Sequence, residues 1–252
     1  MDFIHILEHH LLDTVWLRLP LFNGLLPWSK HALMIAVAWS LLIVLLPLAV
    51  RGRLGVIAKG FVEAIVLFVR DDILEPNLGH AGHQYLGYFC TLFFFILTMN
   101  LLGLVPFGST ATGNIAVTLA MALTTFCLIH IAGIREQGLG HYLHSIVPAG
   151  VPLWLWPIMY PIELLGFGAK CFALTIRLFA NMIAGHIVIL SFISLIFILG
   201  GMNRWVGLFV AAPASMGLVV FVLCLELFVA FLQAFIFTFL TAIFVGGAVH
   251  PH

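Results

Sequence analysis

The sequence predicts an all-α membrane protein. We expect about five membrane-embedded helices plus an amphipathic interfacial helix, the last two spans being long, strongly tilted and paired as a hairpin. Of the 252 residues, 63% are hydrophobic and 8% are charged. Soluble chains carry about 25% charged residues, so this composition is typical of a membrane protein. The apolar runs are long and continuous, whereas the strands of membrane β-barrels alternate in segments of about ten residues.

The charge balance excludes several other classes as first interpretations. Ten basic side chains balance ten acidic ones, so no basic surplus is present to meet the phosphates of a nucleic acid. A soluble enzyme and a disordered chain are excluded by the apolar content. The sequence contains no GxxxxGK[ST] loop, so we expect no direct nucleotide binding and no cofactor.

Residues 1–30 are predicted to form an N-terminal membrane-surface segment. They mix polar and apolar residues, contain Pro20 and Pro27, and include no continuous apolar core of the kind a signal peptide needs. Trp16 and Trp28 are of the type that lies at membrane–water interfaces. We therefore expect a short helix that skims the membrane before the first span.

Residues 31–252 are predicted to form a single integral membrane domain. Its first span, 31–50, is an apolar run that stops at Arg51. A crossing needs about 20 apolar residues, and this run is long enough. Two further uncharged runs predict spans at 85–106 and 114–133.

Residues 54–76 are predicted to form the interfacial helix. Apolar residues recur there at spacings of three and four, while Lys59, Glu63 and Arg70 fall elsewhere on the helical wheel. This pattern is typical of a helix that lies in the plane of the interface. Acidic residues and Pro76 are expected to end it.

The last hundred residues hold two apolar stretches of unusual length. They follow a predicted loop that carries Arg135, and they cover 158–199 and 206–249, which are 42 and 44 residues long. As single helices they would each measure roughly 63–66 Å, against the ~30 Å of a straight crossing. Neither has a polar loop at its centre to satisfy the backbone of a turn. We therefore predict two long tilted helices joined near Arg204.

Basic residues indicate the orientation. The loops after the first and third spans hold five basic residues and the opposite side holds three, so the N-terminus is expected outside and the C-terminus in the cytoplasm. The five are Arg51, Arg53, Lys59, Arg70 and Arg135, and the three are Arg18, Lys30 and Arg204.

Ionisable residues at membrane depth are the candidate functional residues, because burying a charge there is costly. Glu163, Lys170 and Arg177 are spaced by seven and share one helix face. Glu163 and Arg177 lie about 21 Å apart along the axis, which makes a polar track across much of a membrane. For Lys170 we favour a structural role, as a lysine that snorkels to the interface. Asn181 lies one turn beyond Arg177.

A second polar path is predicted beside this track. His186 lies about half a turn round the same helix, and on the following helix Glu226 and Gln233 share a face. In an antiparallel hairpin, His186 and Glu226 both lie on the turn side of Arg177, where they can relay protons. The permanently charged Arg177 would keep the two paths apart and attract a carboxylate of a partner.

These residues carry a resemblance to a known family. The segment Leu-Thr-Ile-Arg177-Leu-Phe-Ala-Asn181-Met-Ile-Ala-Gly-His186 resembles the signature of subunit a of F-type ATP synthases. The segment from Glu226 to Gln233 is similar to the family's last helix, and 99–106 and 113–120 are similar to its middle helices. The likeness covers most of 30–247.

The resemblance implies the role of a static proton channel beside a rotating c-ring, with subunit b of the peripheral stalk and the lipid bilayer as further partners. Arg177 matches the arginine that faces the c-ring carboxylate, and Glu163 matches an acidic residue near the inner exit. The residues that match the outer half-channel and its Arg-adjacent region are Asn181, His186, Glu226 and Gln233. Some members carry Glu at the position of His186 and His at that of Glu226, so the pair is retained with its types exchanged.

Other interpretations stay open at this stage. A secondary transporter would show internal repeats, and no convincing repeat is present. An intramembrane metalloenzyme would use the HxxH pairs His80/His83 and His141/His144, although no metal site is expected from two such pairs alone. Both H⁺ and Na⁺ stay open as the coupling ion, because the c-ring, a different chain, contributes to that choice. A bacterial plasma (inner) membrane is the expected location, because the chain has an extended N-terminal region and no transit peptide.

Overall fold

The computed structural model describes residues 15–21, 24–53, 55–79, 82–104, 111–145 and 152–249. Within them, five helices are long and apolar enough to cross a membrane, and this confirms the predicted helical membrane fold. These candidate spans are Ala32–Val50, Gly82–Gly103, Ile115–Gln137, Trp156–Gly201 and Arg204–Val249. The last two exceed the length of a straight crossing, as the sequence predicted.

The chain forms two compact units, each assembled from separate stretches. The first comprises 1–40, 97–114 and 178–233, and the second comprises 41–96, 115–177 and 234–252. Three helices, α2 (Lys30–Val50), α5 (Gly82–Gly103) and α8 (Trp156–Met202), contribute residues to both units, as does α10 (Ala212–Val249).

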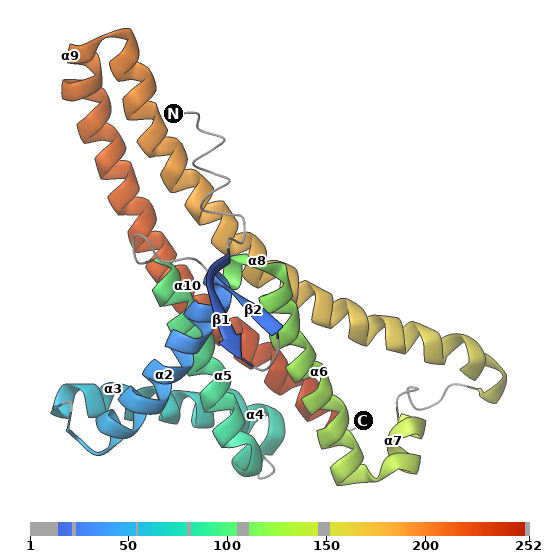
Figure 1. Cartoon of the computed structure of the whole chain (residues 1–252). Coiled ribbons are helices and arrows are strands. Elements are labelled where there is room, and N and C mark those ends of the chain that lie inside the picture. Colours follow the sequence, from blue (N-terminus) through green and yellow to red (C-terminus); the bar gives the residue numbers. More distant parts are fainter. Residues whose placement is uncertain are drawn as a thin grey trace. The chain divides into compact units, whose positions relative to one another are not determined.

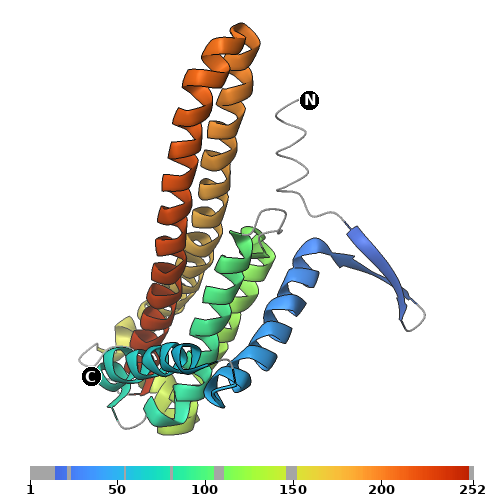
Figure 2. The same cartoon turned by 90° about the vertical axis from the view of Figure 1, so that its left-hand side faces the viewer.

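The first unit begins with a structure that the sequence analysis did not predict. Where we expected a short helix, β1 (Val15–Leu21) and β2 (Gly24–Ser29) pair as an antiparallel ribbon (Figure 2). Pro20 and Pro27 explain the difference, because each lacks the N–H that a helix interior needs, whereas edge strands tolerate proline.

The hairpin of α8 and α10 dominates the first unit. Their segments 178–202 and 212–233 run side by side in both views (Figures 1 and 2), and this confirms the predicted pair of long helices. The turn lies at Asn203, after which α9 (Arg204–Val206) and the π-helical η5 (Gly207–Ala211) continue into α10 as one helical run. Asn203 caps it by accepting a hydrogen bond from the backbone N–H of Trp205 at 3.0 Å. At Gly207 a Cβ would overlap the Cα of Gly200, so the turn depends on close backbone contact between glycines.

The second unit contains the interfacial segment. It consists of α3 (Val56–Phe68), the π-helical η1 (Val69–Leu74) and α4 (Glu75–Leu78), so the helical run reaches Leu78, two residues beyond the predicted end. Pro76 lies in the first turn of α4, where the missing N–H costs no intrahelical bond. The buried side of this segment carries Val62, Ile65, Val69, Ile73 and Leu74.

The region that the sequence analysis assigned to a loop around Arg135 is helical. Arg135 lies within α6 (Ile115–Gln137), and His141 and His144 lie on α7 (Leu139–Ser145). Gly138 separates the two helices with φ 79°, a left-handed conformation that favours glycine. Its N–H donates to the carbonyl of Ile134 at 2.9 Å, which satisfies one of the last carbonyls of α6. The short η3 (Ala111–Gly113) and η4 (Leu153–Leu155) precede α6 and α8.

Aromatic packing and close backbone approaches hold the second unit together. The Phe68 ring meets those of Phe93 and Phe235, at centroid distances of 6.5 and 5.6 Å. Near the end of α10, the Gln137 side chain donates a hydrogen bond of 2.6 Å to the carbonyl of Ala248. A Cβ at Gly246 would overlap the backbone carbonyl oxygen of Asn77, so α10 and α4 touch through glycine.

This contact predicts that Gly246→Ala destabilises the protein, whereas the adjacent Gly247→Ala does not. The added methyl at 246 must displace the backbone of Asn77, and such overpacking costs about 1–3 kcal/mol. At 247 no atom lies within 4 Å of the new Cβ, and alanine gains about 1 kcal/mol of helix propensity. Thermal unfolding of both variants in detergent measures the difference, and equal melting temperatures would contradict the packing described here.

Candidate functional site

Three of the predicted residues lie on α8 in the second unit. Glu163 is half-buried, and Lys170 and Arg177 are exposed. They are at heptad spacing within one unbroken helix, which places them on one face as the sequence predicted. The Lys170 ammonium lies over two aromatic rings, 4.9 Å from the centroid of Phe167 and 4.9 Å from that of Phe244.

Arg177 is an exposed charge on an apolar helix. Among the described residues of that unit, no carboxylate forms an ion pair with it, and its side chain is exposed on an apolar helix. Its neighbours Leu174 and Leu178 are buried, at 3% and 1% exposure, so the helix is packed on one side of Arg177. An arginine that stays charged within a membrane-spanning helix requires an anion or water in contact with it.

The other four predicted residues belong to the first unit. Asn181 and His186 lie on α8 and are half-buried, and Glu226 and Gln233 lie on α10, with Gln233 only 5% exposed. Nδ1 of His186 lies 3.1 Å from the carbonyl oxygen of Met182, one turn earlier. As a donor to that carbonyl, Nδ1 would leave Nε2 free to exchange a proton.

The structure brings Glu226 against the turn of α8 that carries His186. A Cβ at Gly185 would stand 2.7 Å from the carboxyl carbon of Glu226 and overlap its Oε1. The second oxygen, Oε2, is buried and has no hydrogen-bond partner among the described residues. Glu226 therefore fills the space left by a glycine next to His186, with one carboxyl oxygen unpaired.

Gly185 is the site residue that the sequence analysis missed. Its signal lies in the sequence, since a glycine beside a histidine in an apolar helix leaves room for a large side chain on the neighbouring helix. Asn100 is a second buried polar residue of this unit, at 2% exposure, and its amide donates to the carbonyl of Ala230 at 3.4 Å. This bond ties α5 to α10 one turn before Gln233.

The interfacial segment carries the ion pairs that the structure describes outside the spans. The Arg70 side chain donates to both carboxylate oxygens of Asp71, at 2.6 and 3.2 Å. This hydrogen bonding lowers the pKa of Asp71 and raises that of Arg70, so both stay ionised at neutral pH. Lys59 and Glu63 form a looser pair at 3.6 Å.

The histidine pairs gain no support as a metal centre. No group of three or more His, Cys, Asp or Glu side chains lies together within the described residues. His80 falls outside those residues. His144 instead packs against Trp156, with ring centroids 4.6 Å apart.

Comparisons with known proteins agree on one family. The profile described as "ATP synthase A chain" matches residues 32–246. The chain is 46% identical to ATP synthase subunit a of Myxococcus xanthus (strain DK1622) over 243 residues, which cover 92% of this chain and 78% of that protein. It is 43% identical to ATP synthase subunit a 2 of Prosthecochloris aestuarii (strain DSM 271 / SK 413) over 262 residues, 96% of this chain and 78% of the relative. Subunit a of Anaeromyxobacter dehalogenans (strain 2CP-C) is 48% identical over 231 residues, 88% of this chain and 58% of the relative.

Proposed function

Because the chain belongs to the ATP synthase A chain family, it is an integral membrane subunit with a role in proton conduction by an ATP synthase, and we propose that Arg177 separates two offset half-channels in it. Protons would pass through these paths to and from a carboxylate on a rotating c-ring. The subunit itself would perform no nucleotide chemistry, which falls to other subunits.

The observation that carries this proposal is that Arg177 is exposed and forms no ion pair with the described residues of its unit. A guanidinium without a counter-charge in a membrane-spanning helix requires an anion or water in contact with it. A c-ring carboxylate supplies that anion. The ion pair between this carboxylate and Arg177 must also separate as the ring moves. A carboxylate that pairs with Arg177 when it is charged, and leaves when it is protonated, meets this requirement.

The residues of the first unit support the outer path. Glu226 and the His186 turn of α8 lie together, and carboxyl and imidazole groups are the side-chain types that form proton relays in membrane proteins. We propose that protons enter here, pass the region of Asn181 and Gln233, and neutralise the c-ring carboxylate. A neutral carboxyl can leave Arg177 and enter the lipid phase, whereas a charged one cannot.

Glu163 would serve the second path. It lies fourteen residues before Arg177 on the same face of α8, about 21 Å away along the helix axis. We propose that the proton released after rotation leaves toward Glu163. The driving force is about 2.3 kcal/mol per proton for each 100 mV of membrane potential.

The setting of the subunit follows from the same proposal. Subunit b of the peripheral stalk would hold the chain still against the c-ring. The bacterial inner membrane, with the N-terminus outside, fits the distribution of basic residues. In that membrane α8 and α10 would lie strongly tilted, since each is longer than a straight crossing requires.

Arg177→Ala is expected to abolish ATP-driven proton pumping while the complex still assembles, because the c-ring carboxylate loses its charged partner. Pumping in inverted vesicles, with subunit content measured on the same preparation, tests this. The control is Arg204→Ala, which removes an exposed arginine at the hairpin turn and should leave pumping intact. Coupled pumping at the normal rate in the Arg177 variant would refute the proposal.

Glu226→Gln is expected to slow proton entry by at least about tenfold, since a positioned proton carrier contributes about 10²–10⁴-fold to a transfer step. Replacement of His186 by Ala should act in the same direction. Both effects should change with the pH on the outer side, because protonation of this path limits the rate. Glu63→Gln, at an exposed pair on α3, is the control. A defect that is identical at every outer pH would indicate a structural role.

Gly185→Ala is expected to impair proton entry as Glu226→Gln does, although it removes no ionisable group. Its methyl group would displace the Glu226 carboxyl from the His186 turn. Gly217→Ala on α10 is the matched control, since no atom lies within 4 Å of its new Cβ. Rates of passive proton flux through the membrane sector compare the two. Unchanged flux in the Gly185 variant would show that this contact does not place Glu226.

A further inference from the structure

The second unit contains a histidine that the proposed proton paths do not use. His130 lies on α6, two turns before the helix ends at Gln137, and is half-buried. Its Nδ1 lies 2.6 Å from the hydroxyl oxygen of Tyr142 on α7, a side chain that is 4% exposed. An ionisable side chain within a membrane-spanning helix is costly to keep there, so His130 is a candidate functional group.

The packing around Tyr142 holds this pair together. A Cβ at Gly133, one turn after His130, would overlap the Tyr142 ring, so this glycine makes room for the ring against α6. Burial, and after it Tyr160, raise the pKa of Tyr142, so its hydroxyl keeps its proton at neutral pH. A hydroxyl can donate to a neutral imidazole and accept from a charged one. The hydrogen bond can therefore persist whether or not His130 carries a second proton.

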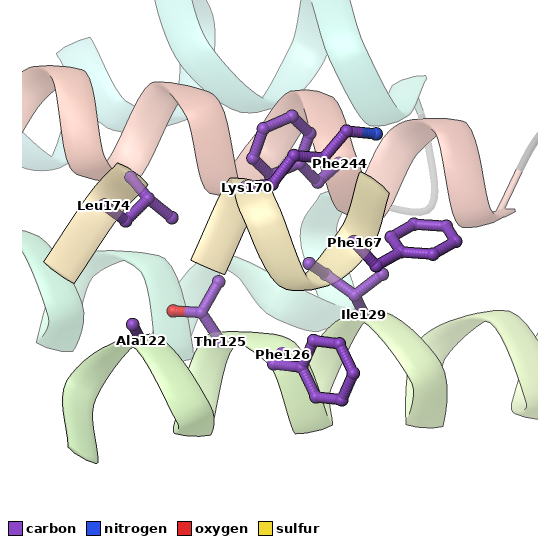
Figure 3. A pocket seen from close by; sticks show the side chains of 8 residues that line it. All are labelled: Ala122, Thr125, Phe126, Ile129, Phe167, Lys170, Leu174 and Phe244. Carbon is purple, nitrogen blue, oxygen red and sulfur yellow. The ribbon is translucent and has the colours of Figure 1, made fainter. Parts of the chain in front are cut away.

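The imidazole also meets α8, the helix that carries the proposed exit path. Its ring centroid lies 5.6 Å from that of Phe167 and 4.3 Å from that of Phe126, and Figure 3 shows these two phenyl rings on α8 and α6. Glu163 precedes Phe167 by one turn on the same face of α8, about 6 Å along the helix axis. Aromatic side chains on a helix point back toward its N-terminus. The imidazole therefore packs against the turn that follows Glu163.

The charged groups on the helices around His130 favour Glu163 as its proton donor. On α8, Glu163 is half-buried, whereas the Lys170 ammonium points away from α6 (Figure 3). On α6 itself, Arg135 and Glu136 are exposed and carry opposite charges. The hydroxyl described above comes from α7, and the part of α10 in this unit carries no ionisable residue. Glu163 is thus the carboxylate on the helix that packs against the imidazole.

We propose that His130 accepts the proton that leaves by way of Glu163 and releases it to water on the inner side of the membrane. Nε2, which forms no hydrogen bond with a described residue, binds and releases this proton while Nδ1 stays bonded to Tyr142. One proton arrives and one leaves, so the ring returns to its neutral form after each transfer. The inference rests on the proposed function, because Glu163 is the exit only in that proposal.

Passive proton flux through the complete complex in inverted vesicles, where the medium sets the pH of the inner side, tests this role. We expect the rate in the parent to change in a step within about pH 5–8, where imidazoles titrate. His130→Asn keeps an amide that can bond the Tyr142 hydroxyl but carries no proton. The flux should fall at least about tenfold and lose this step. His144→Asn, which removes an exposed histidine of α7, is the matched control and should leave both unchanged.

A second variant and a measurement on the parent separate proton transfer from a structural role. Tyr142→Phe keeps the ring against Gly133 and removes the hydroxyl, so flux should fall while the step remains. A loss in His130→Asn that is equal at every inner pH would overturn the proposal. Should that variant fail to assemble, diethyl pyrocarbonate treatment of the parent complex decides, with modified residues located by mass spectrometry. Modification of His130 supports the access to water that the proposal requires, and an unmodified His130 overturns it.

Glu163→Gln distinguishes this inference from the proposed function. Slow flux in Glu163→Gln together with the parent's flux and pH profile in His130→Asn would refute the role of His130 alone. Normal flux in Glu163→Gln would refute both the exit by way of Glu163 and the role of His130 as its acceptor.

Discussion

The cost of a bare charge in hydrocarbon is the constraint on which this structure depends. Arg177 is exposed on an apolar helix and forms no ion pair with the described residues of its unit. Such a side chain requires an anion or water in contact with it, while Leu174 and Leu178, which flank it on the helix, are buried. The ammonium of Lys170, one heptad earlier, lies 4.9 Å from the centroids of Phe167 and Phe244, whose faces attract a cation.

Glycine decides where polar groups meet in this chain. Helices in a membrane gain no hydrophobic energy from pairing, so they associate through close packing and hydrogen bonds. Gly185 leaves the space that Glu226 occupies, Gly207 lets the hairpin turn close on Gly200, and Gly246 lets α10 touch the backbone of α4. A side chain at Gly207 or Gly246 would push against backbone atoms, whereas one at Gly185 would displace the Glu226 carboxyl.

Local chemistry explains which elements the sequence could predict. Uncharged runs of about twenty residues identified the spans, because a helix that crosses the hydrocarbon core needs about 20 predominantly apolar residues. The β1–β2 ribbon was missed, since Trp16 and Trp28 indicate an interface but not the backbone that lies there. The helical state of the region around Arg135 was also missed, because the turn is confined to Gly138 and its left-handed φ of 79°. Polar residues on either side of such a glycine do not distinguish a loop from the end of one helix and a short second helix.

The sequence by itself determined the membrane class, the two long helices, the heptad face of Glu163, Lys170 and Arg177, and the resemblance to its family. These depend on composition and helical periodicity, which are properties of neighbours in the chain. Only the tertiary structure decided that Glu226 lies against Gly185, that Asn100 bonds the carbonyl of Ala230, and that Phe244 lies under the Lys170 ammonium. Each of these contacts joins residues about 40 to 130 positions apart, and packing between helices, rather than spacing along one helix, sets which of them meet.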